Sequence, residues 1–441
     1  MIKITFIGAG STVFARNLLG DAMMSEHLRD AEMALYDIDA ERLEESYIII
    51  NAMNQNINEG RARITKFCGE QNRKDALRDA TFIVNAIQVG GYEPSTVIDF
   101  EIPKKYGLRQ TIGDTLGIGG IMRGLRTITV IKDIAREIEE VCPNAWFLNY
   151  TNPMAIITGY MQRYTKVKTI GLCHSVQVCS EKLLQGLDMA DKLDGRKELI
   201  AGINHMAWLL DIKDNNGNDL YPEIRRRAAE KNRIQKHGDM VRYEYINNFG
   251  YYCTESSEHN AEYNPYYIKS KYPELIEKYC IPLDEYPCRC IDQIEQWKKQ
   301  KEEIMSGGLM QHERSIEYGS RIMEALVSGV PYQINGNVIN SGGFIENLPV
   351  DACVEVPCLV NNYGISPTYV GKLPTQLAAM NMTNINAQLM TIEAAASCNR
   401  KDIYMAAMLD PHTAAELSIE DIKSMVDELI TAHGDYMKEY I

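Results

Sequence analysis

The sequence predicts an α/β protein in which a parallel sheet with crossover helices is followed by a mixed α+β domain. Two observations support this prediction. Over residues 1–175, short apolar runs alternate with longer amphipathic stretches, which is the pattern of parallel strands joined by helices. After about residue 175 this alternation ends. We therefore expect a first domain at residues 1–175 and a second domain at residues 176–441.

The elements of the first domain follow from its apolar pattern. Short apolar runs predict buried strands, and between them apolar residues recur at the spacing of a helix that buries one face. The predicted strands are residues 3–7, 32–36, 82–86, 145–148 and 169–172. The predicted helices are residues 13–24, 40–55, 73–80, 119–141 and 154–164.

The second domain has three distinct stretches. Residues 200–212 have a strand-like pattern, and the tyrosine-rich residues 243–286 indicate irregular structure and short helices around a site. Residues 373–441 are rich in Ala, Met and Leu and predict helices. We expect these last helices to cover a cleft or to form a subunit interface.

The composition excludes several classes of protein. With 45% apolar and 24% charged residues, the chain of 441 residues is neither disordered, nor collagen-like, nor a small disulfide scaffold. There are 46 basic and 60 acidic side chains, for a net charge of -14. This surplus argues against nucleic acid or an anionic membrane as a partner, because both attract clustered Lys and Arg. Small molecules are the expected ligands.

The sequence also predicts a cytoplasmic location. No apolar run approaches the roughly 20 residues that span a bilayer, and the apolar start at residues 2–7 is short for a secretion signal. The eleven cysteines are an odd number without regular spacing. In a reducing compartment we expect most of them to be buried thiols and one or two to be ligands.

The first predicted strand runs into a glycine turn that is typical of dinucleotide-binding sites. Gly8 and Gly10 allow a sharp turn and a close approach to a pyrophosphate. Ser11 and Thr12 open the next helix, where main-chain N–H groups meet the negative charge of the ligand. The third position of the fingerprint is Val13 instead of Gly, which makes the motif less specific.

Asp37 strengthens this interpretation because it lies at the end of the second predicted strand. There its carboxylate accepts hydrogen bonds from an adenosine ribose and repels a 2′-phosphate. The two features predict a Rossmann-type domain that binds NAD rather than NADP. The alternative is a tight turn in an α/β fold that binds no dinucleotide.

Polar clusters follow four later strands and are expected to meet in one crevice, since ligands of open α/β sheets bind beyond the carboxyl ends of the strands. The clusters are residues 88–92, 149–153, 173–175 and 204–205. An Asn before a Pro is also a common turn former, so the second cluster has a purely structural alternative.

Cys173 and His205 offer a thiolate and an imidazole that can hold a divalent metal ion and leave positions open for substrate oxygens. These ligand types alone would suggest zinc or iron, and the alternative is that both side chains are simply packed. Residues 254–263 are dense in carboxyl, imidazole and phenol groups, which move protons when their pKa values are tuned. A charged interface or a hydrogen-bonded core cluster is the alternative for this segment.

Together these motifs resemble glycoside hydrolase family 4, the NAD- and metal-dependent glycosidases, and within it the bacterial α-galactosidases. The resemblance runs from Lys3 to the C-terminal region. The matching segments are residues 4–12, 90–94, 114–120, 148–153, 171–176, 201–207, 254–259 and 410–415.

The resemblance implies a fold similar to the lactate and malate dehydrogenases but a net hydrolysis of a sugar. Most glycosidases use two carboxylates, and this family is an exception. The implied reaction begins with transfer of the C3 hydride to NAD⁺ and removal of the C2 proton, followed by elimination at C1. Water then adds to C1, and NADH returns the hydride. The implied cofactors are NAD⁺ and a divalent ion, usually Mn²⁺.

The resemblance also implies residue roles. Cys173 and His205 look like the metal ligands. Asn152 matches the asparagine that holds sugar hydroxyls, and Asn149 on the same loop would contact cofactor or sugar. Tyr263 is the expected base at C2.

The general acid is less defined. Glu258 is the alternative group for the C2 base and is expected to share that role with Tyr263. Family members that act on phospho-sugars have Asp or Asn after the metal cysteine, whereas this chain has His174, which favours an unphosphorylated substrate. Asp114 is the first candidate for the acid and His174 the second, with a helix cap as the alternative role of Asp114. Arg289 is expected to orient the sugar oxygens or to assist the base.

The leading hypothesis is therefore an α-galactosidase that hydrolyses α-galactosides such as melibiose. The alternatives are a family 4 α-glucosidase or α-galacturonidase, a plain NAD-dependent 2-hydroxy-acid dehydrogenase, and a sugar-binding or regulatory protein without catalysis. The second domain is expected to bind the substrate and to form a homo-oligomer, a dimer or a tetramer.

Overall fold

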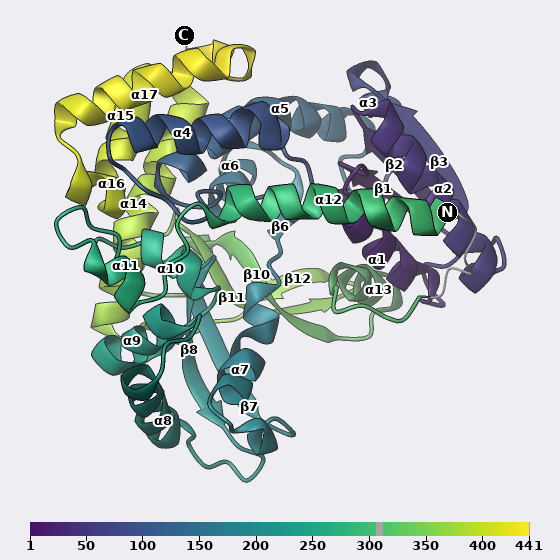
Figure 1. Ribbon diagram of the computed structural model, residues 1–441. Coiled ribbons are helices and arrows are strands. Elements are labelled where there is room, and N and C mark those ends of the chain that lie inside the picture. The colour runs from purple at the N-terminus through teal and green to yellow at the C-terminus, as the bar shows by residue number, and fades with distance from the viewer. Residues whose placement is uncertain (306–311, 441) are drawn as a thin grey trace.

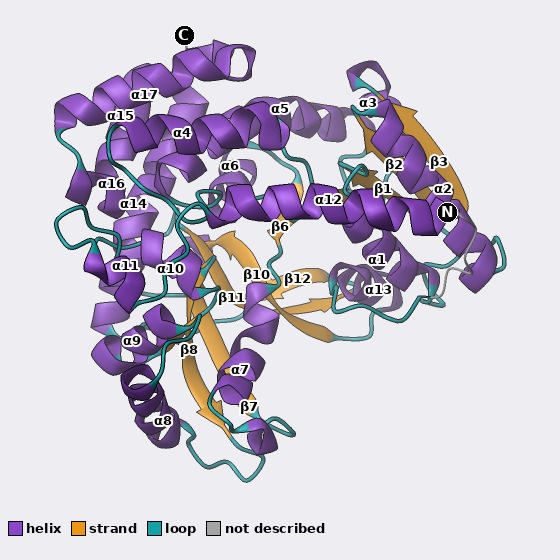
Figure 2. Cartoon of the chain, in the orientation of Figure 1, coloured by secondary structure: helices purple, strands orange, loops and turns teal. Residues whose placement is uncertain are grey.

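A computed structural model of the protein describes residues 1–305 and 312–440 (Figure 1). One mixed sheet runs through these residues, and helices cover both of its faces (Figure 2). Its strand order is β3-β2-β1-β4-β5-β6-β10-β11-β7-β8-β9, and β12 pairs with β11. The sheet therefore joins the two parts of the chain that the sequence assigns to separate domains.

The first six strands are parallel and have the order of a doubly wound dinucleotide-binding fold, which confirms the predicted Rossmann-type architecture. They are β3 (Arg63–Cys68), β2 (Glu32–Asp37), β1 (Lys3–Ile7), β4 (Phe82–Asn85), β5 (Trp146–Asn149) and β6 (Lys168–Gly171). All five predicted strands are present. The edge strand β3 was missed because it is only half-buried and has no continuous apolar run.

Apart from α4, the helices of this half agree with the predicted ones within a few residues. They are α1 (Thr12–Met23), α2 (Ala40–Asn58), α3 (Arg73–Leu77), α4 (Val97–Lys105), α5 (Gly117–Val141) and α6 (Met154–Tyr164). Asp39 caps α2 by accepting hydrogen bonds from the N–H groups of Glu41 and Arg42. The helix α4 was missed, since it is short, carries charged residues and contains Pro103.

The second half extends the sheet with antiparallel strands. A hairpin of β7 (Lys197–Ile203) and β8 (Met206–Lys213) confirms the strand-like pattern of residues 200–212. The strands β10 (Tyr332–Ile339) and β11 (Cys353–Asn361) connect this hairpin to β6, so the sheet continues across the boundary predicted at residue 175. The short strands are β9 (Tyr252–Cys253) and β12 (Gly364–Pro367).

Between these strands lie helices that carry several residues of the site. They are α7 (Ser175–Gly186), α8 (Tyr221–Ile234), α9 (Met240–Phe249), α10 (Ser257–Glu262), α11 (Glu274–Lys278), α12 (Glu285–Met305) and α13 (Gly319–Ser328). Apart from the two-residue strand β9, residues 243–286 are short helices and loops, as the sequence predicts.

The last helices fold back onto the first half of the chain, where they lie beside α4, α5 and α6 (Figure 1). They are α14 (Thr375–Ser397), α15 (Arg400–Leu409), α16 (Pro411–Glu416) and α17 (Ile419–His433), which confirms the predicted helical region up to residue 440. Their apolar side chains join the core of the parallel half. A buried ion pair, in which Asp99 lies 2.7 Å from Arg126 Nη2 and 2.9 Å from His433 Nε2, fixes this packing.

In residues 1–305 and 312–440 no helix combines the length and apolar character that crossing a lipid bilayer requires.

Candidate active site

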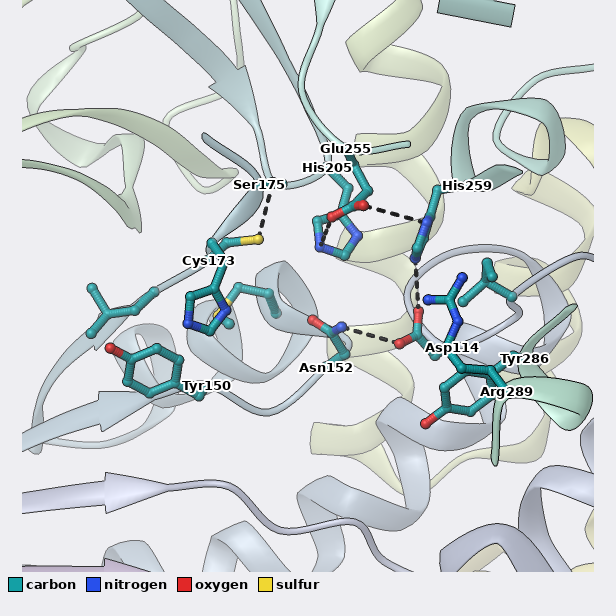
Figure 3. A pocket seen from close by; sticks show the side chains of 14 residues that line it. Asp114, Tyr150, Asn152, Cys173, Ser175, His205, Glu255, His259, Tyr286 and Arg289 are labelled. Carbon is teal, nitrogen blue, oxygen red and sulfur yellow. Dashed lines mark hydrogen bonds and ion pairs between the residues drawn. The ribbon is translucent and has the colours of Figure 1, made fainter. Parts of the chain in front are cut away.

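A cavity of about 240 Å³ lies beyond the carboxyl ends of β5 and β6, where the sequence predicts a crevice (Figure 3). The loops after these strands, the β7–β8 turn, the segment around α10 and the start of α12 all contribute to its wall. The lining residues are Ile112, Asp114, Tyr150, Asn152, Met154, Leu172, Cys173, His174, Ser175, His205, Glu255, His259, Tyr286 and Arg289.

One side of the cavity holds a potential metal site made of Cys173, His205 and Glu255. One ligand atom from each residue lies within 4.8 Å of the others. The set offers a thiolate, an imidazole and a carboxylate, which suits a divalent cation. The sequence predicts the first two ligands. It does not single out Glu255, although this residue belongs to the acidic segment at 254–263.

Local backbone geometry brings these ligands together. His205 lies in the tight turn between β7 and β8 with φ 63°, and Glu255 precedes α10 with φ 60°. Left-handed backbone at non-glycine residues costs on the order of 1 kcal/mol or more and is concentrated at functional sites. The packing of the hairpin and of α10 therefore holds both side chains toward the cavity (Figure 3).

The imidazole of His205 lies between two oxygen groups. Its Nε2 is 3.4 Å from Glu255 Oε2, and its Nδ1 is 3.1 Å from the hydroxyl of Tyr263. Burial opposes protonation, but the negative charges of Cys173 and Glu255 outweigh it and raise the pKa of His205 to about 10. A cation that binds here must displace this proton, so metal binding will depend on pH.

Tyr263, the expected base, lies behind His205 and is not part of the cavity wall. Its side chain is fully buried, and burial together with the nearby Asp114 raises its pKa well above the usual value of a phenol. Toward the cavity it contacts two histidines: its hydroxyl hydrogen-bonds with His205, and its ring lies edge-on to that of His259 with the ring centroids 5.9 Å apart. Glu258, the alternative group for the base, is on α10 and does not line the cavity either.

The other side of the cavity is built around Asp114. Its Oδ2 accepts a hydrogen bond of 3.1 Å from Asn152 Nδ2, and its Oδ1 accepts one of 2.7 Å from Thr115. Burial opposes ionisation, but hydrogen bonding and charge from His259, with the charge of Arg123, hold the pKa of Asp114 well below its usual range. Asp114 does not cap α5, whose N-cap residue is Leu116.

His259 connects the two sides and was not singled out from the sequence. Its Nε2 lies 3.7 Å from Asp114 Oδ1, and its Nδ1 lies 3.6 Å from Glu255 Oε1 (Figure 3). The same Nδ1 lies 2.9 Å from the hydroxyl of Ser256. It lies on α10, four residues after Glu255, and both residues line the cavity. No local pattern in the sequence distinguishes His259 from the other polar residues of the segment 254–263.

The remaining predicted residues divide into two groups. His174 and Arg289 line the cavity, where His174 Nε2 lies 2.5 Å from Glu317 Oε2 and Arg289 pairs with Glu285. Asn149 is fully buried and does not line the cavity. Its amide nitrogen donates to Thr158 Oγ1, and its amide oxygen accepts a hydrogen bond from Asn85.

The predicted cofactor site lies at the start of α1. Gly8 has φ 86°, and a Cβ there would lie 2.7 Å from the carbonyl oxygen of Ala86, so this position requires glycine. The N–H of Gly10 donates to Asp37 Oδ2 at 2.6 Å, and a second N–H, from Asp39, donates to Asp37 Oδ1 at 2.9 Å. Asp37 therefore holds the glycine turn in addition to its predicted contact with a ribose.

Ser11 and Thr12 follow the glycine turn. Ser11 is the exposed N-cap residue of α1, and its side chain makes no capping hydrogen bond. Thr12 is buried, and its hydroxyl hydrogen-bonds with Ser46. The main-chain N–H groups at this helix end are in the position that the fingerprint predicts for binding a pyrophosphate.

Comparison with known proteins assigns a family to this arrangement. The model of the family 4 glycosyl hydrolases matches residues 3–189, and that of their C-terminal domain matches residues 200–413. An α-galactosidase of Bacillus subtilis is 60% identical over 440 residues, covering 100% of both chains. An α-galactosidase of Rhizobium meliloti is 34% identical, covering 99% of this chain and 89% of that protein.

The fold is also shared with a solved structure, a 6-phospho-α-glucosidase from gut microorganisms in complex with NAD and Mn²⁺. It has a TM-score of 0.80 and 20% identity, and the match covers 99% of this chain and 98% of that one. Full-length matches to the family models and to curated relatives agree with the resemblance seen in the sequence motifs. The chain belongs to family 4 of the glycosyl hydrolases.

Proposed function

We propose that the protein is an α-galactosidase that hydrolyses terminal α-galactosides such as melibiose and requires NAD⁺ and a divalent metal ion. The cluster of Cys173, His205 and Glu255 in the wall of the cavity is the observation that carries this proposal. The identity of 60% to a curated α-galactosidase over the full length supports the choice of substrate. We also propose that the protein is cytoplasmic and forms a homo-oligomer, a dimer or a tetramer.

The residues present fit both cofactors. The glycine turn and Asp37 suit NAD⁺, and the carboxylate of Glu255 adds a hard oxygen donor that suits Mn²⁺ better than a thiolate and an imidazole alone would. When bound, NAD⁺ supplies reversible hydride transfer at C3 of the sugar, and the metal ion supplies positive charge beside the sugar oxygens.

The side chains around the cavity would orient the sugar and move protons. The amide of Asn152 is held by Asp114, so its direction toward the sugar hydroxyls is fixed. Asp114 is ionised at neutral pH and is therefore a proton acceptor in the resting enzyme. We propose that Asp114 and the neighbouring His259 transfer the protons at C2 of the sugar and at the leaving oxygen. Arg289 lies at the outer wall of the cavity.

Tyr263 takes a different proposed role from the one that the sequence suggests. Its hydroxyl reaches the cavity only through His205 Nδ1, which favours a role in orienting the imidazole so that Nε2 faces the metal ion. Glu258 and Asn149 also lie outside the wall, and we assign them to the support of α10 and of the β5 loop.

An unphosphorylated substrate is favoured by the wall next to Cys173. Phospho-sugar members have Asp or Asn where this chain has His174, and the carboxylate of Glu317 lies directly against that imidazole. The imidazole of His174 in place of that Asp or Asn is the observation that favours a galactoside without a phosphate group. An α-glucosidase or an α-galacturonidase would use the same groups. The sugar that the protein hydrolyses distinguishes these activities from an α-galactosidase.

A panel of nitrophenyl α- and β-glycosides of galactose, glucose and galacturonic acid, each with and without NAD⁺ and Mn²⁺, tests the proposal. We expect turnover of the α-galactoside only with both cofactors. A galactoside deuterated at C2 should lose the label to water during turnover, and complete retention would contradict the elimination mechanism. Net formation of NADH from a 2-hydroxy acid would favour the plain dehydrogenase instead.

A further inference from the structure

Three consecutive residues just before and at the start of α13 contact the wall of the cavity from behind. Glu317 pairs with His174, Tyr318 contacts Cys173, and Gly319 lies against Tyr150. None of these three residues lines the cavity. They come from a part of the chain far from the cysteine in sequence, so the fold alone brings them together.

The hydroxyl of Tyr318 satisfies both main-chain groups of Cys173. It accepts a hydrogen bond of 2.7 Å from the Cys173 N–H and donates one of 2.9 Å to the Cys173 carbonyl oxygen. The strand β6 ends at Gly171, so the main chain of the cysteine has already left the sheet and has no ladder partner of its own. Both residues are buried, where an unpaired main-chain group is costly.

Tyr318 is itself held in place from several sides. A Cβ on Gly319 would lie 2.7 Å from the Tyr150 hydroxyl and 3.0 Å from Leu18 Cδ1, so α13 packs closely against the cavity wall and α1. Nearby, Ser315 is anchored to Asp21 of α1 by its N–H at 2.8 Å and by its hydroxyl at 2.6 Å. The hydroxyl of Tyr318 therefore has little freedom to move away from the cysteine.

We propose that Tyr318 is a positioning residue that holds Cys173 in the geometry required for metal binding. The inference rests on the metal site of the proposed function. Residues that support metal ligands typically contribute about 10- to 100-fold to metal affinity, because a ligand that is free to move pays an ordering cost when the ion binds. Tyr318 would act in this way through the main chain of the ligand instead of through its side chain.

The test compares Tyr318→Phe with Tyr221→Phe in the full-length protein. Tyr221 is a matched control, since its buried hydroxyl also accepts a main-chain N–H, from Tyr252, and donates to a main-chain carbonyl, that of Leu209. It belongs to a separate core cluster under α8. Binding of Mn²⁺ and of NAD⁺ to each protein is measured by calorimetry, together with the thermal midpoint.

We expect Tyr318→Phe to weaken Mn²⁺ binding about 10- to 100-fold and to leave NAD⁺ binding unchanged. Tyr221→Phe should lower the thermal midpoint without a change in Mn²⁺ affinity. Equal Mn²⁺ affinity in Tyr318→Phe and the unmodified protein would overturn the inference. Failure of the unmodified protein to bind Mn²⁺ would instead contradict the proposed function, and this inference with it.

A second measurement needs no variant and covers the case in which Tyr318→Phe does not fold. The hydrogen bond to Tyr318 should protect the amide of Cys173 from hydrogen exchange as strongly as the neighbouring amide of Leu172, which donates to Asn149. Rapid exchange at Cys173 beside a protected Leu172 would show that the tyrosine does not hold the main chain, and the inference would be wrong.

Discussion

The predicted cofactor site at the start of α1, here called the cofactor end, and the candidate metal site in the cavity, here called the metal end, are built in different ways. At the cofactor end the predicted contacts come from the main chain around Gly8 and Gly10, in the turn after β1, and from one carboxylate, Asp37, at the end of β2. At the metal end they come from side chains on separate elements, among them Cys173 and His205. The conformation of the main chain determines the cofactor end, whereas the charges of buried side chains determine the metal end.

The pKa values at the metal end show how strongly these charges depend on one another. Negative neighbours raise the pKa of His205 to about 10 against the effect of burial. Against the same effect of burial, His259 and His205 lower the pKa of Glu255 to about 2. Removal of one charge at the metal end should therefore shift the pKa values of the neighbouring groups. A change at the cofactor end should leave the metal site unaffected. Three substitutions test this difference.

The largest effect is expected from Cys173→Ser. A serine hydroxyl stays protonated at neutral pH, so the site loses an anionic ligand, and we expect kcat to fall by about 10³-fold or more with loss of bound metal. NAD⁺ affinity and the thermal midpoint should change little, since the two ends are separate. Metal content, NAD⁺ binding and the α-galactosidase rate are measured on the same sample. A variant that keeps both metal and rate would disprove the ligand assignment.

An intermediate effect is expected from Glu255→Gln. The amide keeps the size of the side chain but removes its charge, so Mn²⁺ affinity should fall by about 10- to 100-fold. Glu258→Gln on the neighbouring turn is the comparison, because it removes the same charge outside the cavity wall. We expect it to cost less Mn²⁺ affinity than Glu255→Gln, as measured by titration. The reverse order would mean that Glu258 contributes more to metal binding than Glu255 does, which would contradict the assignment of Glu255 as a ligand.

These two ends also differ in how far the sequence predicts them. Gly8, Gly10 and Asp37 belong to one strand–turn–helix–strand unit, so their spacing along the chain determines their spacing in space. The parallel strands and their helices were predictable for the same reason, since each buries an apolar face.

The metal end depends on contacts that spacing does not encode. Glu255 and His259 reach the cavity only because the β7–β8 hairpin and α10 pack against the loop after β6. Nothing in the acidic segment 254–263 indicates which of its polar residues face inward, and Tyr263 in the same segment faces the core. No local sequence pattern predicts the contact between Tyr318 and Cys173, because 145 residues separate them in the chain.

The smallest effect is expected from Asp37→Asn. The amide oxygen still accepts one of the two N–H groups, from Gly10 or Asp39, so the turn should persist, but the charge that favours NAD⁺ over NADP⁺ is lost. We expect NAD⁺ affinity to fall about 10-fold, which is about 1.4 kcal/mol and within the range for a charge-assisted hydrogen bond, while NADP⁺ binds relatively better. Titrations with both nucleotides and with Mn²⁺ provide the measurement. If Mn²⁺ affinity falls together with NAD⁺ affinity, the two ends are coupled through the cavity, and their separation into a backbone-defined and a charge-defined half does not hold.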